Sequence, residues 1–257
     1  MIAALSADGL TPAFLALALG ITFVAGFVKG TTGFAMPMIM ISGLASFLSP
    51  ELALAGLILP TLVTNVMQAL RDGIAAAWRA VRRFRIYFAV GGACILLAGQ
   101  LVTALDPRIV YALIGIPITG FGLLQIVGWR PRIAPENQRV AEVGLGAASG
   151  IVGGISGVWG PPLVMYLTAL GTPKAEQVRT QGVAFALAAV LLVATHLQSG
   201  VLNTRTLPFS GLMLVPALAG MWIGQRVQDG LDQEMFRKAT LVVLMLAGLN
   251  LLRRAIM

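Results

Sequence analysis

The sequence predicts an all-α polytopic membrane protein made of two inverted structural repeats of about five helical elements each. Three observations support this prediction. The composition is strongly apolar, a glycine-rich motif occurs twice at a fixed offset, and basic residues are divided unevenly between alternate loops. Each repeat is expected to start with a helical hairpin that is interrupted by glycine and proline.

The composition excludes an ordinary soluble domain. With 58% hydrophobic residues, 11% charged residues and a mean hydropathy of +0.88, the chain cannot form a charged, water-exposed surface. Its net charge of +8 is carried by short loops between apolar segments, which indicates membrane orientation and no nucleic-acid partner. Cys94 is the only cysteine, so neither a disulfide framework nor a thiolate metal site is expected.

The repeated motif reads GFVKGTTGFAMPMIMISGL at 26–44 and GIVGGISGVWGPPLVMYLT at 150–168, an offset of 124 residues. Identical residues align at five positions: Gly26, Val28, Gly30, Gly33 and Pro37 with Gly150, Val152, Gly154, Gly157 and Pro161. The sequence therefore predicts a first transmembrane repeat at 1–128 and a second at 140–257, joined by a cytoplasmic linker at 129–139. Corresponding interrupted segments of this kind indicate a substrate site in secondary transporters.

Apolar runs define the elements of the first repeat. They predict helices at 11–29, 34–48, 52–70, 86–104 and 109–128. Turn residues separate these runs at Ser49-Pro50-Glu51 and Asp106-Pro107-Arg108. Helices are predicted because open strand edges cannot face lipid and the alternation typical of membrane barrels is absent.

The second repeat follows the same order. Its helices are predicted at 140–153, 157–170, 178–198, 207–225 and 234–252, and Gly171-Thr172-Pro173 separates the second from the third. The motif segments, at about 15–17 residues, are short for a bilayer core of about 30 Å. Both a short span and a re-entrant hairpin are compatible with that length.

The distribution of lysine and arginine predicts the orientation. With five elements per repeat, the inside loops 71–85, 129–139, 171–179 and 226–238 contain five, three, two and three basic residues, thirteen in all. The outside segments contain four. Four spans per repeat would give a weaker partition of eleven to six. Because an odd number of elements reverses the orientation of the second repeat, the repeats are predicted to be inverted.

Each motif is predicted to break at its glycines and to restart with proline, at Pro37 and at Pro161-Pro162. Proline is tolerated in a first turn because the N–H it removes has no partner there. A restarted helix directs unpaired N–H groups and partial positive charge into the break, which favours an anion. Close helix packing is the alternative explanation for these glycines.

Polar residues near the breaks are hydrogen-bond donors, whereas all ten acidic residues fall in loops or at segment ends. A pocket of donors without carboxylates favours an anion. The predicted substrate-binding residues are Lys29, Gly30, Thr31, Thr32, Gly33, Phe34, Asn65, Gly154, Ser156, Gly157, Trp159, Arg179 and Gln181. Lys29 could instead extend to the membrane surface, and Arg179 could anchor a helix end. His196 is interpreted as a packing residue in preference to a proton relay.

Catalytic interpretations fail. The glycine run at 150–157 lacks the spacing of a dinucleotide loop, and one histidine with one cysteine cannot form a zinc site. No serine, histidine and carboxylate set exists within the apolar segments. The sequence therefore predicts no enzyme, no metal and no cofactor.

The pair GFVKGTTGFAMPMIM and GGISGVWGPPLVMYLTALGTPKAEQVRTQ resembles the TauE/SafE family of sulfite and organosulfonate exporter-like permeases. The resemblance covers essentially the whole chain and is strongest at Gly160-Pro161-Pro162, Tyr166 and Arg179. It implies transport of small sulfur-containing anions across the bacterial inner membrane. Family members often have a further glycine after Gly33-Phe34, where this chain has Ala35.

The expected function is therefore export of a small anion through a site at the two breaks, near the membrane midplane. An inside-negative potential favours outward movement of a monovalent anion by about 2.3 kcal/mol per 100 mV. The expected partners are a small anionic substrate and the lipid bilayer, and the sequence sets no oligomeric state. Transport of another small anion or a neutral solute, or a non-transporting role in membrane assembly, are the alternatives.

Overall fold

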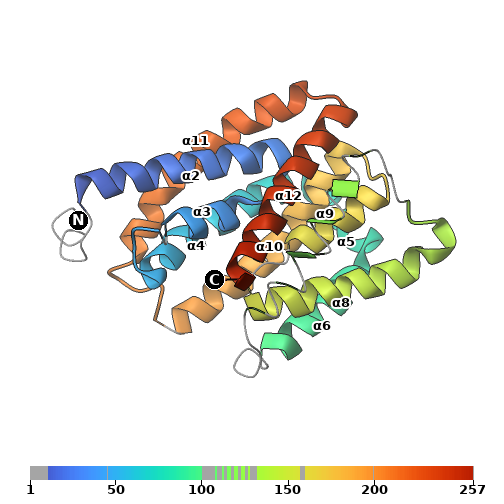
Figure 1. The fold of residues 1–257 in the computed structure, drawn as a ribbon, viewed down its shortest axis with the longest axis horizontal. Coiled ribbons are helices and arrows are strands. Elements are labelled where there is room, and N and C mark those ends of the chain that lie inside the picture. The colour runs from blue at the N-terminus through green and yellow to red at the C-terminus, as the bar shows by residue number, and fades with distance from the viewer. Residues whose placement is uncertain are drawn as a thin grey trace. The chain divides into compact units, whose positions relative to one another are not determined.

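The computed structural model describes residues 11–44, 46–99, 132–156, 160–198 and 200–256, with isolated positions between 108 and 127. Within these ranges all regular structure is helical (Figure 1). The helices are α2 (Pro12–Thr32), α3 (Met36–Leu44), α4 (Pro50–Leu70), α5 (Ile74–Arg83), α6 (Arg85–Gly99), the short η1 (Pro135–Asn137), α8 (Gln138–Ser156), α9 (Gly160–Ala169), α10 (Lys174–Gln198), α11 (Leu207–Gly230) and α12 (Gln233–Ile256).

The chain divides into two compact units. Unit 1 comprises Met1–Gly73 and Gly182–Leu231, and unit 2 comprises Ile74–Gln181 and Asp232–Met257. Each unit therefore contains helices from both predicted repeats. Helix α10 contributes its first turns to unit 2 and the remainder to unit 1.

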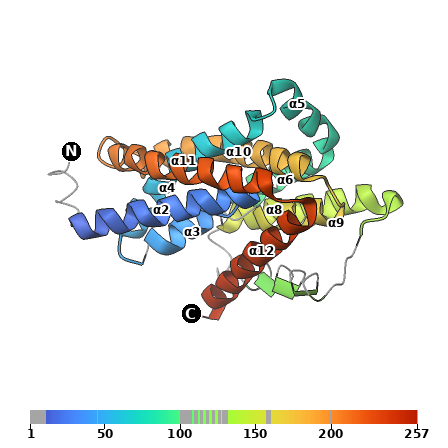
Figure 2. The same ribbon diagram turned by 90° about the horizontal axis from the view of Figure 1, so that it is seen from above.

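Unit 1 is organised around the pair α2 and α11, which lie side by side in both views (Figure 1, Figure 2). Glycines bring the two backbones together. A Cβ atom added at Gly220 would lie 2.1 Å from the carbonyl oxygen of Phe23, and one added at Gly224 would lie 2.2 Å from that of Phe27. On the facing helix, a Cβ at Gly26 would lie 2.3 Å from the carbonyl oxygen of Ala217. The observed helix separation therefore requires glycine at these positions.

Helices α3 and α4 pack against this pair and complete the core of unit 1. Met36, Met40 and Leu44 project from α3 into a buried cluster that includes Phe209 and Met213 of α11. The Leu59 N–H of α4 donates to the Ser210 hydroxyl of α11 over 3.1 Å. These contacts hold α4 beside the junction between α2 and α3.

Unit 2 contains a second close pair, α6 and α8. A Cβ atom at Gly150 would lie 2.3 Å from the carbonyl oxygen of Gly91, and one at Gly146 would lie 3.0 Å from that of Tyr87. The Tyr87 ring stacks on Tyr166 of α9 with centroids 5.3 Å apart. The aromatic stack therefore joins α9 to the α6–α8 pair.

Helix α5 was not predicted from the sequence, which assigned 71–85 to a loop because of its five basic residues. Four alanines give this segment a high intrinsic helix propensity. Ala76, Ala77 and Ala80 are its buried residues, whereas Arg79, Arg82 and Arg83 are exposed. The basic loop is therefore an amphipathic helix.

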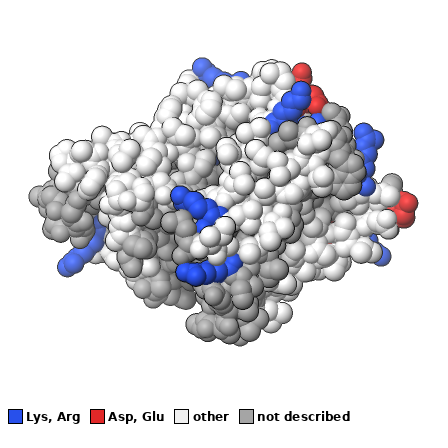
Figure 3. Space-filling view, in the orientation of Figure 1, with Lys and Arg blue, Asp and Glu red and all other residues white. Residues whose placement is uncertain are grey.

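Among the described residues, four helices are long and apolar enough to cross a membrane. These segments are Pro12–Thr32, Leu52–Leu70, Lys174–Ala194 and Leu207–Gly230. Figure 3 shows few charged side chains on the face that it draws. Independently of that view, large apolar residues such as Val24, Val215 and Trp222 are exposed. An exposed apolar surface of this kind suits lipid contact.

Candidate functional site

The most unusual polar residue in unit 1 is Lys29, which lies one turn before the end of α2. Lys29 is only 2% exposed, and its ammonium group donates a hydrogen bond to Oδ1 of Asn65 on α4. Nδ2 of the same amide donates to the carbonyl oxygen of Phe185 on α10 over 3.2 Å. The Phe185 ring centroid lies 5.8 Å from the lysine nitrogen. The structure therefore joins α2, α4 and α10 through a buried cation and a neutral amide.

Asn65 belongs to a buried polar stripe on α4 that sequence reasoning found only in part. Thr61, Thr64 and Gln68 share its helix face, and all are at most 2% exposed. The Gln68 amide donates to the carbonyl oxygen of Gly33 over 2.9 Å. The spacing of three and four residues was the available signal for this stripe, because it places polar groups on one side of an apolar span.

Helix α2 ends at Thr32, and α3 begins at Met36. Gly33 adopts a left-handed conformation, with φ of 86°, and its N–H donates to the carbonyl oxygen of Lys29 over 2.7 Å. Gly33 is therefore the C-cap of α2, and its N–H satisfies a carbonyl oxygen in the last turn of that helix. Phe34 is buried, and Ala35 also has positive φ, 72°.

Two of the predicted site residues instead contact α11. A Cβ atom at Gly30 would lie 2.3 Å from the carbonyl oxygen of Met221, so this glycine permits close packing of α2 on α11. The Thr31 hydroxyl donates to the carbonyl oxygen of Phe27 over 3.0 Å and lies 3.5 Å from that of Gly224. The Thr32 hydroxyl donates within α2, to Val28 over 2.9 Å.

The second motif is described in less detail. Helix α8 ends at Ser156 and includes Gly154, and α9 begins at Gly160. Gly157, Trp159 and the side chain of Ser156 lie outside the described part of the chain. The proposed roles of these residues therefore depend on their sequence correspondence with the first motif.

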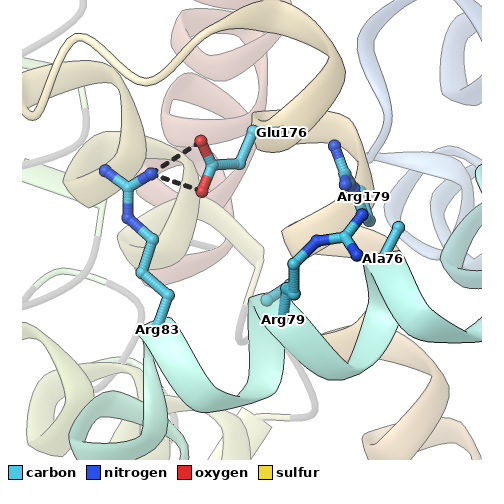
Figure 4. A pocket seen from close by; sticks show the side chains of 6 residues that line it. Ala76, Arg79, Arg83, Glu176 and Arg179 are labelled. Carbon is cyan, nitrogen blue, oxygen red and sulfur yellow. Dashed lines mark hydrogen bonds and ion pairs between the residues drawn. The ribbon is translucent and has the colours of Figure 1, made fainter.

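The remaining two predicted residues belong to α10. Gln181 is fully buried. Arg179 lines a cavity of about 350 Å³ in unit 2, together with Arg79 and Arg83 of α5 and Glu176 of α10 (Figure 4). Sequence reasoning missed Arg79 and Arg83 because it treated their segment as a loop.

Carboxylates are almost absent from the buried polar groups. Among the acidic residues whose side chains are described, Glu142 is the one that is buried, and it lies near the start of the predicted element at 140–153. Its Oε1 accepts from the Tyr87 N–H in the first turn of α6 over 3.3 Å, where a negative charge is favourable. No group of three metal-ligating side chains occurs among the residues described.

Apolar helices of spanning length, exposed apolar surfaces and buried polar clusters define a multi-pass helical membrane protein. The chain belongs to the sulfite exporter TauE/SafE family, whose family model matches residues 18–251. This confirms the resemblance seen in the motifs. Members of the family are membrane transporters of the sulfite and organosulfonate type, so the chain is a transporter and not an enzyme.

Neither a curated protein nor a solved structure matches the chain significantly. The individual substrate and the residues that bind it are therefore argued from the site.

Proposed function

We propose that the chain exports small sulfur-containing oxyanions, such as sulfite or organosulfonates, across the bacterial inner membrane. The observation that carries this proposal is the burial of Lys29 among neutral polar groups. The family supports the substrate class, and the chemistry around Lys29 supports the sign of the charge.

A buried ammonium group loses its hydration and must be compensated by partners. Asn65 accepts one of its three possible hydrogen bonds but supplies no negative charge. No carboxylate pairs with Lys29 among the described residues. A bound anion would supply the missing charge, whereas a cation would be repelled.

The surroundings of Lys29 also suit a sulfonate. The Thr61 hydroxyl lies one turn from Asn65 and has no hydrogen-bond partner in the described ranges, so it can donate to an anion oxygen. Phe185 is a buried apolar neighbour of Lys29, and Phe34 is buried just beyond the end of α2; both aromatic rings suit an organic substituent. We therefore place Lys29, Thr32, Gly33, Phe34 and Asn65 in the proposed binding region.

The offset of 124 residues assigns a second set of residues to this function. It aligns Thr32 with Ser156 and Gly33 with Gly157. We propose that each motif supplies one break near the midplane, with the positive end of a restarted helix facing the anion. The second set consists of Gly154, Ser156, Gly157 and Trp159, with Arg179 and Gln181 on the following helix.

Two helix pairs support the inverted repeat. In unit 1, Gly26 contacts Ala217, and in unit 2, Gly150 contacts Gly91. Gly26 and Gly150 are separated by the motif offset of 124 residues, and their partners Gly91 and Ala217 are separated by 126 residues. The contact positions of the pair α2 and α11 therefore match those of the pair α8 and α6 after one common sequence offset, to within two residues. A duplicated unit is expected to show such a match.

Contacts between the predicted inside loops support the orientation. Ion pairs or a hydrogen bond connect each of the loops 71–85, 171–179 and 226–238 to the other two. The contacts are Arg71–Asp229 at 2.7 Å, Arg83–Glu176 at 2.6 Å, and the Lys174 N–H to Gln233 at 2.8 Å. Because loops on opposite sides of a bilayer could not be bonded in this way, these contacts support placing the three loops on one side.

Outward transport of an anion needs no coupled ion when the cell interior is negative. Proton or sodium coupling commonly uses a carboxylate within the membrane. The buried Glu142 caps α6, and this structural role leaves export driven by membrane potential as the simplest mechanism.

Ligand competition on the purified full-length protein tests the proposal. Methanesulfonate and sulfite are expected to bind, whereas dimethyl sulfone, a neutral analogue, and tetramethylammonium are not. Stronger binding of dimethyl sulfone than of methanesulfonate would refute an anion site. Absence of both binding and flux in a correctly folded preparation would instead favour an assembly role.

A further inference from the structure

The cavity in unit 2 lies between α5 and the first turns of α10. Its volume of about 350 Å³ is at the lower end of the range for small-molecule sites, about 300–1,000 Å³. Ala76 and Ala80 provide small apolar walls, and the rest of the lining is charged (Figure 4). The space therefore suits a compact charged group.

The lining is strongly positive. Three guanidinium groups, of Arg79, Arg83 and Arg179, accompany one carboxylate, that of Glu176. Nη1 of Arg83 contacts both oxygens of Glu176, at 2.6 and 2.7 Å, so these two charges compensate each other. Figure 4 shows the Arg79 side chain directed towards Arg179, on the opposite side of the cavity from this ion pair. Two guanidinium groups that line one cavity favour a phosphate-type oxyanion, because each can donate two parallel hydrogen bonds.

The outer surface of α5 has the composition of a membrane-surface helix. Ile74 is 77% exposed and Trp78 is 55% exposed, while the Arg82 guanidinium lies 5.5 Å from the Trp78 ring centroid. Tryptophan and arginine are typical of the lipid headgroup region. Because α5 joins two apolar helices, α4 and α6, through short turns, it must remain close to the membrane surface.

We infer that the pocket lined by Arg79 and Arg179 binds the phosphate of an anionic phospholipid headgroup. The oxyanion chemistry alone would also accept a soluble phosphate. The exposed Ile74 and Trp78 favour the lipid, since they provide apolar surface next to the arginines. The predicted cytoplasmic location of loop 71–85 agrees, because that leaflet attracts basic segments through its negative lipids. This inference is independent of the substrate that the transporter carries.

Native mass spectrometry of the detergent-purified full chain tests the inference. The probes are phosphatidylglycerol, phosphatidylcholine and inorganic phosphate, each added at the same concentration. The wild-type protein is expected to retain phosphatidylglycerol over phosphatidylcholine, and Arg79→Gln to reduce this retention about fivefold. Arg205→Gln is the matched control, because it removes one exposed arginine from a predicted outside loop. It should leave retention unchanged.

A second variant separates charge from geometry. Arg79→Lys keeps the charge but loses the planar pair of donors, so its retention should fall between those of wild type and Arg79→Gln. Equal retention of the two lipids, or equal losses in Arg79→Gln and Arg205→Gln, would overturn the inference. Displacement of phosphatidylglycerol by equimolar inorganic phosphate would assign the pocket to a soluble anion and overturn the lipid source.

Discussion

At the scale of single residues, the contact between Lys29 and Asn65 is central to the proposed mechanism. Both side chains belong to apolar spans, and each is 2% exposed. The contact orients the ammonium group towards α4. The Lys29 ammonium group can therefore bind an anionic ligand as well as stabilise the packing of α2 on α4.

Replacement of Lys29 by glutamine is expected to weaken sulfonate binding by about 10- to 100-fold, the effect of losing a charged hydrogen bond. The amide should still donate to Asn65, so the amount of folded protein should remain close to wild type. Selectivity for anions should not reverse, because oriented backbone dipoles remain. Isothermal titration with methanesulfonate measures the effect, with Arg205→Gln as the control. Unchanged affinity would remove Lys29 from the binding region.

Gly33 and Thr32 should respond differently to substitution. Gly33→Ala places a side chain at φ of 86° and is expected to cost about 1–2 kcal/mol of stability, while Thr32→Ala should cost about 1 kcal/mol or less. A bulkier residue at Gly33 should also lower transport more than it lowers expression. Thermal unfolding and proteoliposome flux measure the two effects. Parallel losses of flux and folded protein in all variants would favour a packing role alone.

Sequence reasoning identified Lys29 and Asn65 as polar residues in apolar spans, and the structure brings them into contact. It missed the hydroxyl groups of Thr61 and Thr64. Threonine is common in membrane helices because it can bond to its own backbone, as Thr64 does to Pro60 over 2.6 Å. The sequence could not show which threonines share the buried face of Asn65, since burial depends on how α4 is rotated against its neighbours.

At the scale of the helices, close glycine contacts determine how α2 and α11 pack. Apolar side chains on membrane helices gain little by leaving lipid, so packing of closely approaching backbones contributes much of the association. The glycine spacing of four residues was visible in both helices. The partner of each helix was not visible, because α2 and α11 are separated by most of the chain.

Two glycines of α11 provide a direct test of this packing. A Cβ atom at Gly220 would lie 2.1 Å from a carbonyl oxygen of α2, whereas one at Gly211 would have no neighbour within 4 Å. Gly220→Ala is expected to destabilise the protein by about 1–3 kcal/mol. Gly211→Ala should be neutral or stabilising by up to about 1 kcal/mol. Thermal stability in detergent measures both, and equal effects would contradict the close approach.

Element boundaries illustrate the limits of apolar patterns. The predicted elements correspond to helices wherever the structure describes them, but α5 was overlooked. Hydropathy detects segments that suit lipid, and α5 is instead stabilised by alanine propensity and a narrow buried side. The predicted element at 109–128 is described only at scattered positions between 112 and 127, which are helical except for Val127.

At the scale of the whole molecule, the division into two compact units differs from the order of the repeats along the chain. Unit 1 combines α2, α3 and α4 with α11 and most of α10, and unit 2 combines α8, α9 and α12 with α5 and α6. The sequence offset could predict duplication, but it could not predict this exchange, because equivalent helices can pack within or between repeats with similar energies.

Orientation is tested by cysteine labelling in a Cys94→Ala background. Cysteine introduced at Ala75, an exposed position of α5, should react only with membrane-permeant reagents in intact cells. Cysteine at Thr204, in an exposed loop before α11, should react with impermeant ones. The opposite pattern would overturn the inside assignment of loop 71–85.

Transport should follow the membrane potential. Vesicles loaded with methanesulfonate are expected to release it faster when their interior is negative. The potential then favours outward movement of the anion by about 2.3 kcal/mol per 100 mV, which sets the upper limit of the effect. Reversing the potential should slow release, and a proton gradient alone should change it little. Flux that followed the proton gradient instead would refute uncoupled export and make His196 the first residue to examine.

The Lys29–Asn65 contact also has a consequence for biosynthesis. The ribosome makes Lys29 first, and Asn65 follows 36 residues later. Until α4 inserts, Lys29 must stay in the headgroup region, because a lone lysine at the centre of a membrane helix costs about 2.5–3.5 kcal/mol. Its position one turn from the end of α2 permits this. Burial of the cation is therefore a late step that follows insertion of α2, and it links maturation of the transporter to the insertion of α4.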